Sequence, residues 1–159
     1  MKILVVSDTH GIVLESIFGA LAGGKDIDMI IHCGDKYNDA EKLSKLVGVK
    51  DFFRVVGNCD YDINNGANLL DFEIENKRIL VTHGHLQNVK DGLDNLKSLA
   101  KERCADIVFF GHTHISHNEL EYNILYFNPG SPILPKGGKA SYGIVEISED
   151  KITSKIVNL

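Results

Sequence analysis

Residues 2–10 read Lys-Ile-Leu-Val-Val-Ser-Asp-Thr-His, a short apolar run that leads directly into polar residues. Aliphatic and β-branched runs of this length are typical of buried strands. The polar residues that follow include Asp8 and His10, whose oxygen and nitrogen atoms are of the kind that bind divalent cations. The stretch therefore predicts a buried strand that ends at a polar site.

The same pattern recurs four more times along the chain. Largely apolar runs at 29–31, 52–56, 79–81 and 107–110 lead into the blocks Gly34-Asp35, Gly57-Asn58-Cys59-Asp60, His83-Gly84-His85 and Gly111-His112-Thr113-His114. Ligands of open α/β sheets bind beyond the carboxyl ends of the strands. If these strands lie side by side, we expect their ends to gather the polar side chains in one place.

The N-terminal third alternates strands with helices. Apolar residues recur at near-helical spacing at 12–21 and 38–47, and Asn38 or Asp39 would cap the second helix. Strands are expected at 2–7, 28–32 and 51–56. Such a βαβαβ series implies a parallel sheet with right-handed crossovers.

The rest of the chain predicts hairpins around one further helix. Residues 69–74 and 77–81 flank Glu75-Asn76, which is typical of a β-hairpin, and residues 92–103 have the spacing of an amphipathic helix. A strand at 106–110 precedes hairpin-like runs at 119–121, 124–127, 142–147 and 151–157. We therefore expect one α/β domain over 1–159, a two-layered β-sandwich flanked by helices. Its sheets would be mixed parallel and antiparallel, with a more antiparallel second sheet built from the C-terminal third.

Composition narrows the class of protein. The chain has 159 residues, 43% hydrophobic and 25% charged, with a formal net charge of −5. An acidic balance argues against stable binding to the nucleic-acid backbone, which requires a basic face. No stretch approaches the roughly 20 apolar residues of a membrane span, and the N-terminal run is too short for a signal peptide. Three cysteines without a CxxC pair favour reduced thiols. We expect a cytoplasmic protein with no membrane association.

The blocks hold more donor side chains than one metal ion can use. They contain Asp8, His10, Asp35, Asn58, His83, His85, His112 and His114. A single catalytic zinc site takes three protein ligands. Two ions bridged by one carboxylate would use the set, and such pairs suit displacement at phosphorus. Mixed nitrogen and oxygen donors without thiolate favour manganese, iron, zinc, nickel or cobalt over magnesium alone.

The ordered blocks, with the later Asn128-Pro129-Gly130-Ser131, resemble the calcineurin-like metallophosphoesterases. Within that family the chain is similar to the small bacterial and archaeal phosphodiesterases of the YfcE type. The resemblance implies two divalent ions, manganese first among them, and a phosphodiesterase in which a hydroxide shared by the ions attacks phosphorus. It implies that Asp8, His10 and His114 hold one ion, that Asn58, His83 and His112 hold the other, and that Asp35 bridges them.

One position departs from the family pattern. Many members have His directly after the motif Asn, where this chain has Cys59. A thiol is a weak hydrogen-bond donor and a poor substitute for imidazolium. We therefore expect diesters to be preferred over unactivated monoesters, with His85 contacting phosphate or delivering a proton. The alternative role for His85 is to orient His83.

A second function class remains open at this point. The same fold resembles the retromer subunit that serves mainly as a protein-interaction scaffold, although non-catalytic relatives are expected to lose metal ligands and all seven positions are filled here. A metalloprotease would require a motif such as HExxH, which the chain lacks. We expect a small phosphodiester or nucleotide-like substrate, and exposed C-terminal hairpins would allow a homodimer.

Several further polar residues carry structural expectations. His32 lies in an apolar run, which favours a buried, hydrogen-bonded imidazole. Asp60 would either orient its neighbours or serve as a simple turn carboxylate. Residues 128–131 are expected to form a turn beside the metal site, and Cys33 and Cys104 to be small core residues.

Overall fold

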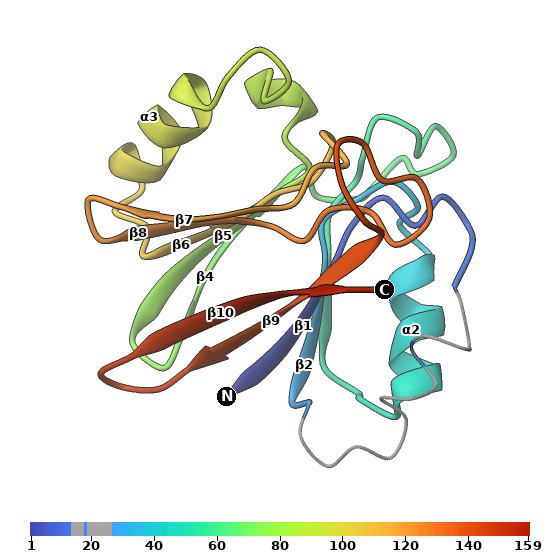
Figure 1. Cartoon of the computed structure of the whole chain (residues 1–159), viewed down its shortest axis with the longest axis horizontal. Coiled ribbons are helices and arrows are strands. Elements are labelled where there is room, and N and C mark those ends of the chain that lie inside the picture. The colour runs from blue at the N-terminus through green and yellow to red at the C-terminus, as the bar shows by residue number, and fades with distance from the viewer. Residues whose placement is uncertain (14–17, 19–26) are drawn as a thin grey trace.

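The strands form two five-stranded sheets, one above the other in Figure 1, in a computed structural model that describes residues 1–13, 18 and 27–159. The first sheet has the order β10-β9-β1-β2-β3 and consists of β1 (Lys2–Val6), β2 (Met29–His32), β3 (Phe52–Arg54), β9 (Ser141–Ile147) and β10 (Ile152–Asn158). The second has the order β4-β5-β6-β8-β7 and consists of β4 (Leu69–Ile74), β5 (Lys77–Thr82), β6 (Ile107–Phe109), β7 (His117–Glu121) and β8 (Ile124–Asn128).

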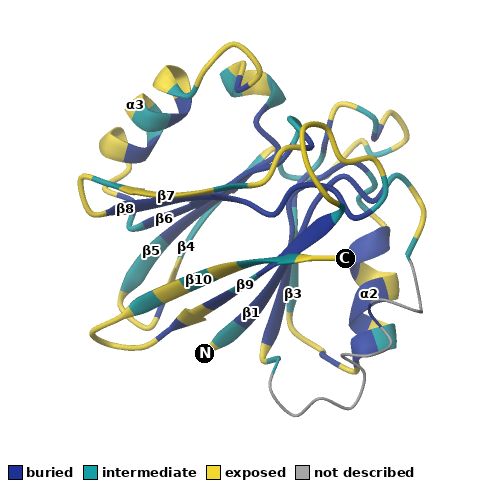
Figure 2. Cartoon of the chain, viewed as in Figure 1, coloured by how far each residue is buried: buried dark blue, intermediate teal, exposed yellow. Residues whose placement is uncertain are grey.

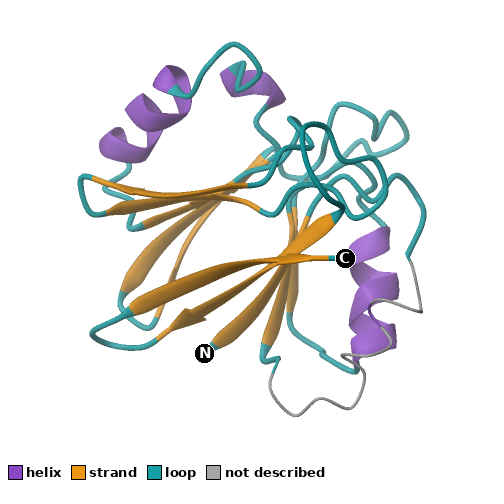
Figure 3. Ribbon diagram, viewed as in Figure 1, coloured by secondary structure: helices purple, strands orange, loops and turns teal. Residues whose placement is uncertain are grey.

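Helices cover the outer faces of this sandwich. Helix α2 (Asp39–Val47) packs on the first sheet and α3 (Asp94–Glu102) on the second, and a short 3₁₀ helix, η2 (His85–Gln87), precedes α3 (Figures 1 and 3). The predicted two-layered α/β sandwich with mixed sheets is confirmed. The helix expected at 12–21 lies largely outside the described residues.

Alternation along the strands builds the core. Ile3 and Val5 of β1 face the second sheet, whereas Leu4 and Val6 pack toward α2. Because successive side chains of a strand point to opposite faces, one apolar run supplies two cores. Figure 2 shows the result: the central strands are buried along their length, while the outer face of α3 and many of the connecting loops are exposed.

Strand pairing within the N-terminal third follows the expectation. β1 pairs in parallel with β2, and β2 with β3. The hairpin at Glu75-Asn76 is also confirmed: β4 and β5 are antiparallel, and both turn residues have positive φ angles, 48° and 59°. Positive φ at both central residues is the geometry that matches the twist of a two-residue hairpin.

The expected composition of the second sheet was wrong. Strands β9 and β10 of the C-terminal third join the first sheet, where β9 pairs antiparallel with β1. Only β7 and β8 join the second sheet, beside β6. Alternation assigns a face to each strand, but it does not name the strand's partner, and β9 lies more than a hundred residues from β1 in the sequence.

The start of α2 also differs from the expectation. Asn38 occupies the N-cap position but its side chain makes no capping hydrogen bond. The carboxylate of Asp39 instead accepts hydrogen bonds from Thr9 Oγ1 at 2.7 Å and from the Gly11 N–H at 2.8 Å. It also pairs with Lys42. The first residue of α2 therefore anchors the loop that follows β1.

All three cysteines are free thiols. Cys33 is a buried core residue as expected, but Cys104 is exposed just after α3, so that expectation was wrong. Among the described residues, none of the helices combines the length and apolar character that crossing a bilayer would need.

Candidate metal centre

The five polar blocks meet where the two sheets converge. Three of them follow the parallel strands β1, β2 and β3, and two follow β5 and β6, so the strands lie side by side in two groups. Hydrogen bonds join the groups: the His112 N–H donates to Asp8 Oδ2 at 3.1 Å, and His83 Nδ1 lies 2.7 Å from the Cys33 carbonyl oxygen. The site is therefore assembled from both layers.

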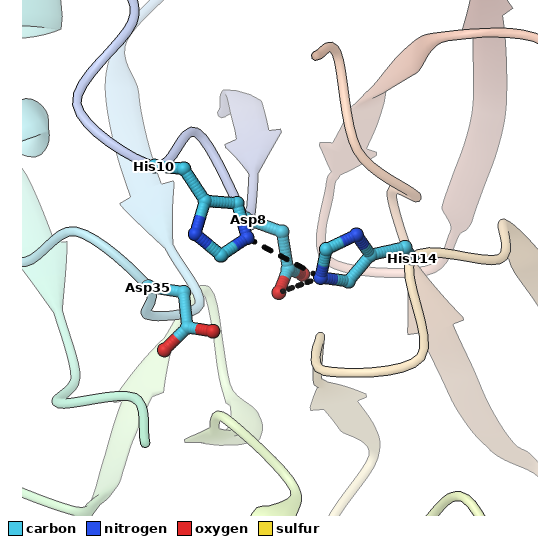
Figure 4. Close-up of side chains that lie close together, drawn as sticks. All are labelled: Asp8, His10, Asp35 and His114. Carbon is cyan, nitrogen blue, oxygen red and sulfur yellow. Dashed lines mark hydrogen bonds and ion pairs between the residues drawn. The ribbon is translucent and has the colours of Figure 1, made fainter. Parts of the chain in front are cut away.

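One group of donor atoms consists of Asp8, His10, Asp35 and His114, whose ligand atoms all lie within 4.8 Å of one another (Figure 4). His114 Nε2 lies 3.1 Å from Asp8 Oδ1 and 3.3 Å from His10 Nε2. Asp8 Oδ1 is buried and has no hydrogen-bond partner.

The proton on His114 indicates what this group can bind. Its Nδ1 lies 2.7 Å from the carbonyl oxygen of Leu134, which can only accept, so Nδ1 carries the hydrogen of the neutral ring. Nε2 then presents a lone pair toward the unpartnered carboxylate oxygen of Asp8. Buried lone pairs that face one another fit a cation at their centre.

A second group of donor atoms surrounds His83. Its Nε2 lies 3.1 Å from Asn58 Oδ1, 3.2 Å from His112 Nδ1 and 3.4 Å from Asp35 Oδ2. Its Nδ1 lies 2.7 Å from the Cys33 carbonyl oxygen and therefore carries the hydrogen of the neutral ring. As in His114, the lone pair of Nε2 then faces the other donor atoms. The structure thus brings all seven expected metal-binding residues together in two groups, and Asp35 belongs to both.

Backbone conformation at these residues is unusual. Five of the seven have positive φ angles, namely Asp8 (56°), His10 (49°), Asp35 (51°), His112 (69°) and His114 (59°). The left-handed region costs a non-glycine residue about 1 kcal/mol or more and persists where the surroundings enforce it. In the turns at residues 8–10 and 112–114, this conformation lets two side chains that are two residues apart point toward the same site.

Asp60 holds two of these turns in place. Its buried carboxylate accepts hydrogen bonds from the backbone N–H groups of Asp35 at 3.2 Å, Tyr37 at 2.8 Å and Gly57 at 2.8 Å. Of the two roles left open by the sequence, the orienting one is therefore confirmed.

Residues 128–131 form the expected turn beside the site. Asn128 Nδ2 donates to the Gly111 carbonyl at 2.9 Å, and its Oδ1 accepts from the Gly130 N–H at 2.9 Å. Ser131 Oγ donates to the Asp8 carbonyl at 2.8 Å. This turn ties the loop after β8 to the loops after β1 and β6.

His32 is the buried, hydrogen-bonded imidazole that was expected. The Gly34 N–H donates to its Nδ1 at 3.2 Å, and Thr9 Oγ1 lies 3.0 Å from its Nε2. Because Thr9 donates its own hydrogen to Asp39, it must accept the Nε2 hydrogen. Burial lowers the pKa of His32 to about 4, so the ring is neutral.

Electrostatics keep the carboxylates ionised. Burial raises the pKa of Asp35, but its hydrogen bond to His83 and the charge of that ring outweigh burial, and the pKa falls well below the usual range. The pKa of Asp8 is lowered in the same way, against burial, chiefly by His114. The same pairings raise the pKa of His83, against its burial, and of His114. A proton and a cation therefore compete for these nitrogens.

Cys59 and His85 occupy different places. Cys59 is half-buried in the wall of the site, and its N–H donates to Asp35 Oδ1 at 2.8 Å. Burial and the neighbouring Asp35 raise the pKa of its thiol to about 11. The His85 ring centroid lies 5.4 Å from that of His83 and 6.1 Å from that of His112, and its buried Nδ1 has no partner.

The donor groups open into a pocket of about 410 Å³, here called the metal pocket. Its wall includes Lys90, Leu134, Pro135 and Lys136 besides the donors. Sequence reasoning missed these four residues because they lie in loops with no periodicity or motif.

Comparison with known proteins agrees with this geometry. Residues 1–150 match the family model described as the calcineurin-like phosphoesterase superfamily domain. A Bacillus subtilis protein named "Probable metallophosphoesterase YsnB" is 36% identical over 154 residues, which span 96% of this chain and 88% of that protein. "Phosphodiesterase YfcE" of Escherichia coli K12 is 31% identical, with 92% and 88% covered.

Solved structures share the fold. A predicted phosphoesterase from Streptococcus pneumoniae superposes with a TM-score of 0.81 at 28% identity, covering 99% of this chain and 88% of that one. A zinc complex of Vps29 from Entamoeba histolytica superposes with a TM-score of 0.80 over 99% of both chains, but at 20% identity it supports the fold alone. The chain belongs to the calcineurin-like phosphoesterase superfamily, and it is similar to the phosphoesterases of the YfcE type.

Proposed function

We propose that this protein is a phosphodiesterase that works with two divalent cations, manganese first among them and nickel, iron, zinc or cobalt as alternatives. The observation that carries the proposal is the position of Asp35 between two groups of donor atoms. One group is Asp8, His10 and His114, and the other is Asn58, His83 and His112. Family membership supports a phosphoesterase at a coarser level.

When bound, the cations would lower the pKa of water and neutralise the oxygens of the phosphoryl group. The chain's own residues position the reactants. The ionised carboxylates of Asp8 and Asp35 supply negative charge that would offset the positive charge of the cations. The turns after the strands fix the direction of the imidazole rings. In the overall reaction, a water oxygen forms a bond to phosphorus, one ester P–O bond breaks, and the proton of water passes to the departing alcohol.

His85 remains the best imidazole for a phosphate contact or proton delivery. No hydrogen bond joins it to His83 within the described residues, since His83 Nδ1 donates to the Cys33 carbonyl. This weakens the alternative role of orienting His83. The His85 ring lies beside those of His83 and His112, with ring centroids 5.4 Å and 6.1 Å away, and this proximity to the donor groups supports the proposed role.

Cys59 is proposed to set the preference for diesters. A thiol whose pKa is raised to about 11 is neutral and donates weakly, so it neither stabilises the extra charge of a monoester nor protonates a poor leaving group. Replacing it by imidazole, in Cys59→His, is expected to raise kcat/KM for phenyl phosphate relative to bis-p-nitrophenyl phosphate by about tenfold or more. An unchanged ratio of the two kcat/KM values would show that Cys59 does not set the preference for diesters.

The alternative function is a non-catalytic interaction scaffold, with which the fold shared with Vps29 is compatible. Metal content together with turnover of bis-p-nitrophenyl phosphate separates the two. The proposal expects Asp35→Asn to lower turnover by more than about 100-fold, beyond what loss of an outer-shell partner costs. A protein that binds no metal and turns over no diester with manganese, nickel or zinc would be a scaffold.

Two further properties belong to the same proposal. A cytoplasmic location is supported by the three free thiols. A homodimer is supported by β7 and β10, each of which is an edge strand of its sheet, since edge strands can pair with a second chain. Light scattering of the purified chain tests the dimer, and a monomer at all concentrations would exclude it.

A further inference from the structure

A second hollow adjoins the metal pocket. It has a volume of about 510 Å³ and lies between the segment that joins η2 to α3, the end of β6 and the loop before β7. Its apolar lining comes from Val89, Leu93, Phe110 and Ile115. We call it the apolar groove.

The two hollows share walls. Lys90 and Lys136 line both the metal pocket and the apolar groove. Along the loop after β6, His112 and His114 line the metal pocket, whereas Thr113 and Ile115 line the groove. One loop thus presents its donor side chains to one hollow and its intervening side chains to the other.

The groove has the character of a binding surface. Phe110 and Val89 are buried and form its base, while Ile115 keeps 49% of its surface exposed at its edge. A volume of this size is within the usual range for small-molecule sites, roughly 300–1,000 Å³, which combine apolar walls with a few polar groups. A hollow of this volume has room for one ring system.

The shared lysines place positive charge at the junction of the two hollows. The net charge is −5, yet two ammonium groups stand at the junction of the hollows. Lys90 lines the metal pocket together with His112 and His114. Phosphate oxygens at this junction would find complementary charge.

We propose that the apolar groove binds the ring of a nucleoside-like phosphoester while its phosphate occupies the metal pocket, with Lys90 and Lys136 binding phosphate oxygens between the two. This assignment rests on the proposed function and deepens it. It commits the substrate to a phosphoester with at least one apolar or aromatic substituent, and it adds no chemical step to the hydrolysis.

The test compares two inhibitors that carry the same phosphate. Thymidine 5′-monophosphate and methyl phosphate are titrated against hydrolysis of bis-p-nitrophenyl phosphate by the manganese-loaded protein. The wild type is expected to bind the thymidine compound more tightly. Ile115→Ser should reduce that preference by about tenfold, the size of effect that a lost apolar contact in a pocket produces. Leu120→Ser is the matched control, since Leu120 is exposed on β7 outside the groove.

The lysines make a separable contribution. Lys136→Ala should weaken both inhibitors about equally, because both carry the phosphate, whereas Lys139→Ala, in the same loop but outside both hollows, should change neither. Weakening of the thymidine compound alone would reassign Lys136 from the phosphate to the ring.

The outcomes also separate this inference from the proposed function. Normal hydrolysis with the same inhibitor preference in wild type and Ile115→Ser would leave the phosphodiesterase intact and remove the groove as a subsite. If no hydrolysis occurs, calorimetric binding of the two phosphates to the manganese-loaded protein still tests the groove by the same comparison. A dimer that dissociates in Ile115→Ser would identify a second copy as the occupant instead.

Discussion

Asp35 is the residue on which the site depends. Its Oδ2 faces His83, its Oδ1 accepts the Cys59 N–H, and its carboxylate also lies within reach of Asp8, His10 and His114. A left-handed backbone at Asp35 turns the side chain into this position, and Asp60 holds the turn through the Asp35 N–H. The position of one carboxylate is therefore set by a second, buried carboxylate that does not face the pocket.

Replacing that second carboxylate tests its positioning role. In Asp60→Asn an amide replaces one oxygen that accepts a backbone N–H, so a buried hydrogen bond is lost at a cost of about 1–3 kcal/mol in the free energy of unfolding. Metal affinity should fall by about 10–100-fold. Urea unfolding and manganese titration measure the two effects. Asp62→Asn, an exposed change in the same loop, is the control, and equal metal affinity in both variants would contradict the role.

The raised pKa values of His83 and His114 predict how metal binding depends on pH. In the metal-free protein these rings hold protons to a higher pH than usual, and a cation must displace them. Affinity for manganese should therefore fall as the pH drops through the raised values, by up to about tenfold per pH unit for each proton displaced. Titrations between about pH 6 and 8 measure this slope, which His117→Gln should not alter. A flat profile would contradict the prediction.

At the scale of elements, periodicity predicted the strands and the hairpin but not the partners. The run Ile3–Val6 was recognisable as a buried strand, and Glu75-Asn76 as the turn of the hairpin formed by β4 and β5. The pairing of β9 with β1 was not predictable, because it depends on contacts between sheets. Gly143 of β9 illustrates this, since a Cβ there would lie 2.2 Å from Phe127 of the opposite sheet.

Gly143→Ala tests that close approach. The added methyl group would push the Phe127 ring out of its place, and overpacking of this kind costs about 1–3 kcal/mol in the free energy of unfolding. Gly138→Ala is the matched control, since nothing lies within 4 Å of a Cβ added there. Urea unfolding compares the two variants. Equal stability would mean that the sheets approach less closely at this point.

At the scale of the whole molecule, the sequence predicted the donors better than the pocket that holds them. Eight donor residues could be named because each follows a recognisable strand, and parallel strands bring such ends to one edge. The resemblance to the metallophosphoesterases then selected seven of them as metal ligands. That edge turned out to be shared by two sheets. Lys90, Leu134 and Lys136 could not be named, since loops that form a wall have no period and take their places only from the fold.

The central claim is that two cations share Asp35 in a protein that hydrolyses phosphodiesters. The most direct measurement is the number of manganese ions bound per chain, by equilibrium dialysis, in samples whose hydrolysis of bis-p-nitrophenyl phosphate is followed as metal is added. The account predicts two ions per chain, with turnover appearing as the second one binds. Full turnover with one ion per chain, or with none, would contradict it.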